Sequence, residues 1–390
     1  MTLVPSREME TSARTGLIKL TLSSFRSYKS LSLSCDARPV ILTGANGAGK
    51  TNILEALSFL GPGRGLRSAK LSLVTYAGEP PLKESPFEWS ISSHFQTPEG
   101  VTSVGTGLEI SEGRERRVVK IDDDRGLPQT ALSQVTSILW LTPQMDRLFV
   151  EGTSARRKFM DRLVYLFDRS HAARVARYDY TMRERLKLLK QGRHEDAWLS
   201  SLEAKMAESS IAIAAARRTL VERLMQAKVW ALGVFPRPRL EIEGVPEDLL
   251  ETLPALSAEE RLQSLYKANR LKDYESGRTQ EGSHKTDLRV WFTEKNMPAE
   301  LCSTGEQKAL LISIIMAAAR LQAAQEGLVP LVLFDEVVAH LDEQRRQALF
   351  DEILHLRMQA WMTGTDRDLF LPLNDQVQHF EVEKSTLTPV

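Results

Sequence analysis

Cysteine is scarce in this chain, since only Cys35 and Cys302 occur in 390 residues, and no apolar stretch with a cleavage site opens the sequence. Both observations predict a cytoplasmic protein. No run approaches 18 apolar residues, which argues against a membrane-spanning segment and an integral transporter. Net charge is also lacking, because 51 basic residues balance 51 acidic ones. Any nucleic-acid binding must therefore depend on local clusters of charge.

What remains is the composition of an ordinary soluble globular protein, with 42% hydrophobic and 26% charged residues. The length allows two domains with cores of their own. Residues 1–14 are polar and show no periodicity, so we expect them to be disordered.

A glycine-rich segment connects the apolar run Val40–Leu42 to a helical pattern that begins near Lys50. It fits a phosphate-binding loop at every required position. Backbone N–H groups and the helix N-terminus would hold the phosphates, Lys50 would reach the β and γ phosphates, and Thr51 would ligate Mg²⁺. The predicted ATP-binding residues here are Gly44, Ala45, Asn46, Gly47, Ala48, Gly49, Lys50, Thr51 and Asn52. An incidental glycine-rich turn is the alternative.

Alternation and helical spacing predict the order of elements along the chain. Strands are expected over 17–25, 40–43 and 137–142, an antiparallel sheet over 87–121, a turn over 122–130 and a helix over 50–60. Residues 154–234 lack proline and repeat apolar residues at helical spacing, which predicts two or three long helices. The predicted division is a split ATP-binding head, 15–144 with 282–390, and an inserted, mainly helical lobe, 145–281.

Two further segments predict the rest of a nucleotide site. The apolar run Leu331–Phe334 suits a strand buried on both faces, and it ends in Asp335 and Glu336. Asp335 would ligate Mg²⁺ and Glu336 would orient or deprotonate the attacking water. Ser303, Thr304, Gly305, Glu306 and Gln307 precede a strongly apolar helix. Ser303 with Glu306 fits a capping box, while the small residue and the amide suit a second anion site.

This order of motifs resembles the ABC-type ATPase head, an α/β fold with a parallel core sheet and an antiparallel subdomain. The resemblance implies a head-to-tail dimer in which residues 303–307, the signature, reach the nucleotide of the other copy. It also implies that Gln144 completes the Mg²⁺ shell and assists catalysis, and that Asp342 is the D-loop acid. Such heads usually carry a switch histidine after the next strand, but residues 360–365 contain none. Thr363 or Thr365 would then sense phosphate.

Nearly the whole chain from Leu17 resembles the RecF family, on motifs that lie in both predicted domains. The matching stretches are Phe25-Arg26-Ser27-Tyr28, residues 44–57, Gly63-Arg64-Gly65-Leu66-Arg67, residues 142–161 and Gly282-Ser283-His284-Lys285-Thr286-Asp287. Ser283 and Thr286 depart from the family pattern, which leaves the role of Asp287 open. The resemblance implies ATP-dependent dimerisation on duplex or gapped DNA, slow hydrolysis, and recombinase loading with RecR and RecO.

Two groups of basic residues are candidates for DNA contact. Arg64 and Arg67, with Lys70, follow the phosphate-loop helix, and the helical segment carries Arg177, Arg183, Arg185 and Lys187 among further basic residues that extend to Arg193. A solvated helix face is the alternative for the second group. Arg26 is a candidate nucleotide ligand or an exposed hairpin residue. No base-reading motif occurs, so binding should be weakly sequence-specific and strongly salt-dependent.

Three other functions compete with this interpretation. An SMC-like chromosome-maintenance head needs a long heptad-patterned segment between the phosphate loop and the signature, and this chain is too short for one. A nucleotide-gated clamp with negligible turnover would keep every binding residue and lack hydrolysis. A small-molecule P-loop kinase would leave the segment from Ser303 to Lys308 without a role.

Overall fold

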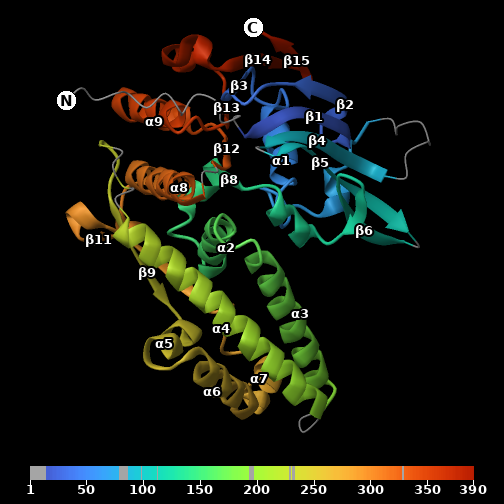
Figure 1. The fold of residues 1–390 in the computed structure, drawn as a ribbon, viewed down its shortest axis with the longest axis vertical. Helices are drawn as coiled ribbons and strands as arrows, with labels where there is room; N and C mark the ends of the chain where they lie inside the picture. The colour runs from blue at the N-terminus through green and yellow to red at the C-terminus, as the bar shows by residue number, and fades with distance from the viewer. Residues whose placement is uncertain are drawn as a thin grey trace, which may run out of the picture. The chain divides into compact units, whose positions relative to one another are not determined.

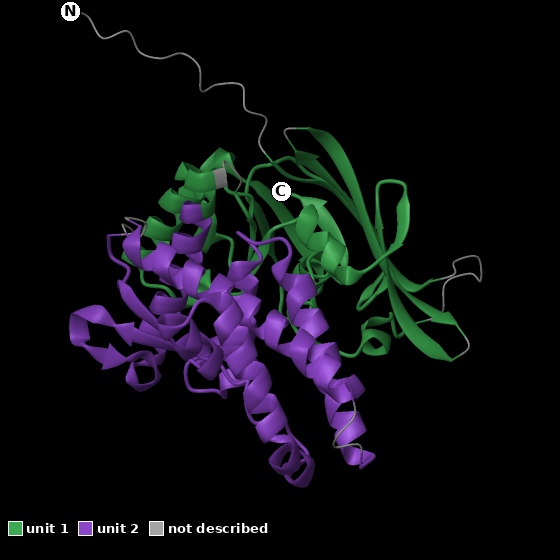
Figure 2. Cartoon of the chain, turned by 60° about the horizontal axis from the view of Figure 1, so that its bottom comes forward, with its two compact units in different colours: residues 1–143, 322–390 green, residues 144–321 purple. Residues whose placement is uncertain are grey.

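The computed structural model describes residues 15–78, 87–97, 99–111, 113–192, 197–227, 230, 233–326 and 329–390. The segment 1–14, for which disorder was expected, lies outside these ranges. The chain forms two compact units, residues 1–143 with 322–390 and residues 144–321 (Figure 2). The predicted second boundary falls between residues 281 and 282, whereas the units divide inside helix α8 (Thr304–Glu326). The predicted division into a split ATP-binding head and an inserted helical lobe stays a prediction.

The first unit contains a mainly parallel sheet of six strands. Its order is β15 (Thr386–Pro389), β14 (Gln378–Glu383), β3 (Val40–Thr43), β13 (Ala360–Gly364), β12 (Leu331–Phe334) and β8 (Ile138–Leu141). Only β15 is antiparallel to its neighbour among these strands. Strands β3, β8, β12 and β13 are buried at every residue, as their uninterrupted apolar runs predict. The carboxyl ends of β3 and β12, which lead into the two predicted halves of the nucleotide site, therefore meet at one edge.

A second, antiparallel sheet in the same unit has the order β2 (Tyr28–Ser34), β1 (Gly16–Phe25), β4 (Phe87–Thr97), β5 (Gly100–Ser111), β6 (Arg114–Ile121) and β7 (Asp124–Leu127). The predicted turn over 122–130 was wrong in part, because residues 124–127 pair with β6 as an edge strand. Helix α1 (Lys50–Ser58) contacts β1, β8 and β13. Helix α9 (Glu343–His355) follows β12 in the chain.

The second unit is mainly helical. Its helices are α2 (Thr153–Val164), α3 (His171–Lys190), α4 (Ala197–Gln226), α5 (Val245–Thr252), α6 (Ala255–Ala268), α7 (Arg270–Ser276) and the first part of α8. Helix α4 packs along α3, α5 and α6 (Figure 1). The core of these helices includes Tyr178, Met206 and Tyr266. The long helices α2, α3 and α4 confirm the helical pattern of 154–234.

Three short strands complete the second unit, in the order β11 (Met297–Pro298), β10 (Asp287–Phe292) and β9 (Pro238–Glu243). All neighbouring pairs are antiparallel. Strand β9 and helix α5 lie in the proline-rich stretch 236–254, and helices α6 and α7 follow within residues 255–276. The hairpin from β10 to β11 leads directly to the predicted signature residues.

Candidate nucleotide site and its companion surfaces

The loop between β3 and α1 is the core of the candidate nucleotide site. Gly44, Gly47 and Gly49 have φ values of 144°, 81° and 116°, which side-chain-bearing residues rarely adopt. A Cβ on Gly44 would lie 2.2 Å from Val382 O, and one on Gly49 would lie 2.7 Å from Tyr28 Oη. These two glycines are therefore required by the protein packed behind the loop.

Neighbouring strands hold the loop in place. Tyr28 Oη donates to Gly49 O at 3.2 Å, and the Ser385 backbone N–H donates to Ala48 O at 3.0 Å. Helix α1 begins at Gly49 without a side-chain cap from the described residues, and its first turn carries no acid. The positive end of the helix is therefore directed at an open loop, which is the arrangement that binds phosphate.

Lys50 lies inside this loop with only 4% of its surface exposed. Its Nζ donates to Gly44 O at 2.6 Å and to Ala45 O at 2.9 Å. Burial lowers the pKa of the Lys50 ammonium, while the nearby Glu336 and Asp335 carboxylates raise it. A cation whose partners are neutral carbonyls can exchange them for phosphate oxygens, which are stronger acceptors.

Asp335 joins the end of β12 to the first turn of α1. Its Oδ1 accepts hydrogen bonds from Thr51 Oγ1 at 2.8 Å and Thr363 Oγ1 at 2.9 Å. Burial raises the pKa of the Asp335 carboxyl, and the two hydroxyl donors oppose that shift. Oxygen ligands of this kind fit Mg²⁺, which usually takes one or two protein ligands and completes its shell with phosphate and water. Thr51 and Asp335 therefore lie close enough together to bind one Mg²⁺ ion between them.

Glu336 follows in an unusual backbone conformation, with φ at +53°. Its N–H donates to Thr363 Oγ1 at 2.9 Å. The Thr363 hydroxyl therefore holds both acidic residues, one through its oxygen and one through its proton. Thr363 is fully buried and engaged inside the protein, whereas Thr365, its predicted alternative as a phosphate sensor, is exposed.

A buried carboxylate on α1, which the sequence argument did not single out, binds two arginines. Arg26 donates from Nε to Glu55 Oε2 at 2.9 Å and from Nη2 to Oε1 at 2.6 Å. Arg67 Nη1 donates to Glu55 Oε2 at 2.9 Å and to Asn52 Oδ1 at 3.0 Å. An acid inside an apolar helical run was the signal that could have identified Glu55. Arg26 is therefore not an exposed hairpin residue, and its role as a nucleotide ligand stays a prediction.

Arg64, Arg67 and Lys70 are exposed on the loop after α1, where the DNA prediction places them. Arg67 differs from the other two because its guanidinium is tied to Glu55. The three cations share one short segment of the first unit. Their contact with DNA stays a prediction.

The signature residues begin helix α8 in the second unit, and the predicted capping box is confirmed. The Ser303 N–H and Oγ each donate to Glu306 Oε2 at 2.9 Å, and the Glu306 N–H donates to Ser303 Oγ at 3.4 Å. Ser303, Thr304 and Gly305 are exposed. Gln307 is not, because its side chain is buried and its Nε2 donates to Cys302 O at 2.8 Å. This amide is therefore held inside the second unit in the single chain, and its role in a second anion site stays a prediction.

Gln144 and Asp342 complete the set of predicted nucleotide residues. Gln144 is exposed on a short helical turn, Pro143–Arg147, and belongs to the second unit. Asp342 is the N-cap of α9 in the first unit, where its Oδ1 accepts from the Arg345 N–H at 2.8 Å. The cap gives Asp342 a local structural role. The catalytic role of Gln144 and the interface role of Asp342 stay predictions.

The prediction that Arg185 belongs to a DNA-contacting face of α3 is wrong. Arg185 has no exposed surface, and its guanidinium binds Glu203 Oε1 at 3.0 Å and Asp273 Oδ2 at 2.5 Å. It points into the bundle because α4 and α7 carry acids at this level of α3. Arg177, Arg183 and Lys187 are exposed on α3, as predicted, while Arg193 lies outside the described residues.

The segment 282–287 also serves the interior of the second unit. Gly282 has φ +121°, and a Cβ there would lie 2.1 Å from Tyr178 Oη. His284 Nδ1 lies 2.7 Å from Tyr178 Oη, and Thr286 Oγ1 donates to buried Glu247 at 2.9 Å. Asp287, whose role the sequence left open, accepts a bidentate pair from Arg156 at 2.7 and 2.9 Å. The motif therefore joins the helices of this unit.

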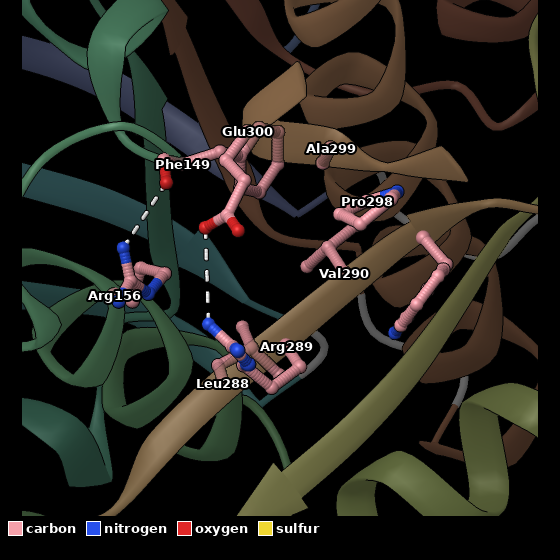
Figure 3. Close-up of a pocket in the computed structure, with 9 residues that line it drawn as sticks. Phe149, Arg156, Leu288, Arg289, Val290, Pro298, Ala299 and Glu300 are labelled. Carbon is pink, nitrogen blue, oxygen red and sulfur yellow. Dashed lines mark hydrogen bonds and ion pairs between the residues drawn. The ribbon is translucent and has the colours of Figure 1, made fainter. Parts of the chain in front are cut away.

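A small cavity of about 150 Å³ is lined by residues that precede the signature segment in the sequence. Figure 3 shows Phe149 and Pro298–Glu300 on one side and Leu288–Val290 on the other, with the Arg289–Glu300 ion pair at 3.8 Å. Nucleotide-sized ligands occupy pockets of at least about 300 Å³. This cavity is therefore too small to be the ATP site.

Among the described residues, no group of three or more histidine, cysteine or acidic side chains is arranged to hold a metal. A site formed by one hydroxyl, one carboxylate and phosphate oxygens does not need such a group. Within the same residues, no helix combines the length and apolar character needed to cross a bilayer.

Comparison with known proteins places nearly the whole chain in one group. Residues 16–388 match the model of the RecF/RecN/SMC N terminal domain. The chain is 41% identical to the DNA replication and repair protein RecF of Mesorhizobium japonicum, over 97% of this chain and 98% of that protein. It is also 41% identical to the protein of the same name from Agrobacterium fabrum, over 96% and 99% of the two chains.

Solved structures support the same fold. The recombination mediator protein RecF-ATP, solved in a study of the RecFOR pathway, matches with a TM-score of 0.81 and 19% identity over 98% of this chain and all of that chain. An Smc head domain from Pyrococcus furiosus, bound to the C-terminal domain of ScpA, matches with a TM-score of 0.54 and 17% identity over 96% of each chain. At these identities the structures establish the ABC-ATPase-type head fold, as predicted.

Proposed function

The chain belongs to the RecF family, and on that premise we propose that it is an ATP-dependent DNA-binding protein of recombinational repair and replication restart. ATP binding drives two copies into a head-to-tail dimer on duplex or gapped DNA, and slow hydrolysis releases them. The dimer assists recombinase loading at single-strand gaps with RecR and RecO. We assign this role to the cytoplasm, where the chromosome lies.

The observation that carries this proposal is the convergence of Lys50, Thr51 and Asp335 at one edge of the parallel sheet. The Thr51–Asp335 distance of 2.8 Å links the phosphate loop to the acidic strand end. Thr51 and Asp335 would hold Mg²⁺, with Gln144 as a further ligand. When bound, Mg²⁺ neutralises phosphate charge and polarises the phosphoryl group. Lys50 exchanges loop carbonyls for phosphate oxygens as the nucleotide enters.

Hydrolysis is assigned to Glu336, which orients or deprotonates the attacking water. Thr363 holds the Asp335 carboxylate and the Glu336 backbone N–H, which places both acidic residues at the end of β12. The signature residues of the partner copy bind the γ-phosphate from the opposite side. The missing switch histidine favours slow turnover.

Glu336→Gln tests the hydrolysis step. Loss of a general base costs about 10²- to 10⁴-fold, so single-turnover hydrolysis with DNA present should fall by that factor. Nucleotide binding should remain, because the variant keeps the phosphate loop. Equal, near-zero rates for wild type and variant would instead favour the clamp with negligible turnover.

DNA binding is assigned to the exposed cations, with no base-specific contact. Fluorescence anisotropy with two duplexes of different sequence should give similar affinities that fall steeply with salt. Paired variants, Arg64→Ala with Lys70→Ala and Arg177→Ala with Lys187→Ala, should each reduce the salt slope if their surface contacts phosphates. Salt-insensitive affinity would contradict this assignment.

A further inference from the structure

The tip of α8 carries a negative charge where a phosphate is expected to bind. Glu306 lies in the first turn, and its Oε2 already accepts two hydrogen bonds from Ser303. In the single chain, the Ser303 hydroxyl therefore donates its hydrogen bond to Glu306. An incoming phosphate would compete with Glu306 for that proton, and the two like charges would repel.

Lys295, on the preceding hairpin, provides a positive charge that pairs with Glu306. Its Nζ forms an ion pair with Glu306 Oε1, the oxygen that Ser303 leaves free. Lys295 ends the short turn Thr293–Lys295 between β10 and β11, and Asn296 follows in the left-handed region with φ +45°. The ammonium also lies 5.5 Å from the centre of the Phe292 ring. Turn and ring thus restrict where the ammonium can lie.

The two oxygens of Glu306 have separate partners, so one carboxylate links Lys295 to Ser303. These contacts lower the pKa of the Glu306 carboxyl to about 2, with Lys295 as the largest cause and Ser303 next. Glu306 is therefore charged at neutral pH. Lys295 is half exposed, with 50% of its side chain accessible.

We propose that Lys295 is a positioning residue for the second nucleotide contact, where it neutralises Glu306 so that the α8 tip accepts the triphosphate held by another copy. This inference rests on the proposed head-to-tail dimer. It assigns Lys295 to charge compensation and leaves direct contact with the phosphate to Ser303 and the helix N–H groups. Each dimer contains two such tips, so a defect acts twice.

A merely structural role makes different predictions. A surface ion pair contributes little to folding, so Lys295→Met should hardly change the free energy of unfolding in either case. Charge compensation predicts that Lys295→Met weakens ATP-dependent dimerisation and that removing the Glu306 charge as well restores it. A merely structural role does not predict this restoration. Gln at position 306 keeps the capping box, because Glu and Gln serve that position alike.

The test measures the ATP-dependent dimerisation constant by sedimentation at fixed salt for wild type and five variants. The variants are Lys295→Met, Lys295→Arg, Glu306→Gln, Lys295→Met with Glu306→Gln, and the control Lys267→Met, an exposed lysine on α6. Binding of a fluorescent ATP analogue to the single chain is measured beside it. That binding should not change in Lys295→Met, Lys295→Arg or Lys267→Met.

We expect Lys295→Met to weaken the dimer about tenfold or more and Lys295→Arg to retain it. Glu306→Gln should dimerise at least as tightly as wild type, and adding Lys295→Met to it should cost nothing further. If the double variant stays as weak as Lys295→Met, or if Lys295→Met matches Lys267→Met, the inference is overturned while the proposed dimer stands. A wild type that fails to dimerise with ATP overturns the proposed function itself, and the inference with it.

Discussion

Thr363 is the side chain on which the two acids of the candidate site depend. It donates to Asp335 and accepts from the Glu336 N–H, at 2.9 Å each. Its buried hydroxyl thus satisfies two groups at the end of β12. If Asp335 binds Mg²⁺ as proposed, loss of the hydroxyl that orients its carboxylate should lower activity.

Thr363→Val replaces this hydroxyl by a methyl group of similar size. We expect single-turnover ATP hydrolysis to fall about 10- to 100-fold, because Asp335 and Glu336 lose their common support. Thr363→Ser should retain most of the rate. Thr365→Val, at an exposed position two residues on, is the matched control, and an equal effect of both valines would contradict the role of Thr363.

His284 makes the second unit sensitive to acid. Burial lowers the pKa of its imidazole to about 4, against the ordinary value of 6.5. Its Nε2 faces Thr279 O at 2.9 Å and its Nδ1 faces Tyr178 Oη at 2.7 Å. Because Thr279 O can only accept, Nε2 carries the proton and Nδ1 accepts from Tyr178.

The sign of the pH dependence follows from these values. Between pH 6.5 and about 4 the unfolded chain binds a proton at this histidine and the folded chain does not, so stability falls as pH falls through that window. The loss from His284 across this window is about 3 kcal/mol. Denaturant unfolding at several pH values should show it, and His284→Gln should flatten this part of the profile. An unchanged slope would contradict the account.

Helix α1 is held at both ends. Tyr28 and the Ser385 N–H support the loop at its start. At its end, the buried Arg117 of β6 donates to the carbonyls of Phe59 and Gly63 and lies 5.0 Å from the Phe59 ring. Burial lowers the pKa of Arg117 to about 9. A cation at these carbonyls also complements the negative end of the helix.

Arg117→Met should therefore destabilise the first unit by about 2–3 kcal/mol, because buried carbonyls lose their donor. Arg116→Met is the control, since Arg116 is the exposed neighbour on the same strand. Thermal unfolding of the two variants provides the comparison. Equal melting temperatures would show that Arg117 does not support the end of α1.

The elements that the sequence predicts well are those with an unambiguous hydrophobic pattern, either an uninterrupted apolar run or helical spacing of apolar residues. The buried runs at Val40–Thr43 and Leu331–Phe334 and the proline-free helical segment all formed as expected. Arg185 was misplaced because a basic residue on a long helix gives no local sign of acids that arrive from α4 and α7. Glu55 was not singled out, and the burial of the Gln307 side chain was not foreseen, for the same reason, since their partners are fixed only by the tertiary fold.

The two units each carry part of the predicted machinery. The phosphate loop, Asp335, Glu336 and Asp342 belong to the first unit, while Gln144 and residues 303–307 belong to the second. Dimerisation driven by ATP follows from the proposal that the signature acts on a second copy.

The central claim is that ATP joins two copies through the exposed tip of α8. Mass by light scattering should be measured with ATP, with ADP, and with ATP for Ser303→Arg, each with and without duplex DNA. The account predicts twice the monomer mass of 43.9 kDa for wild type with ATP, and monomer in the other two cases. A wild-type chain that remains monomeric at saturating ATP with duplex present would contradict it.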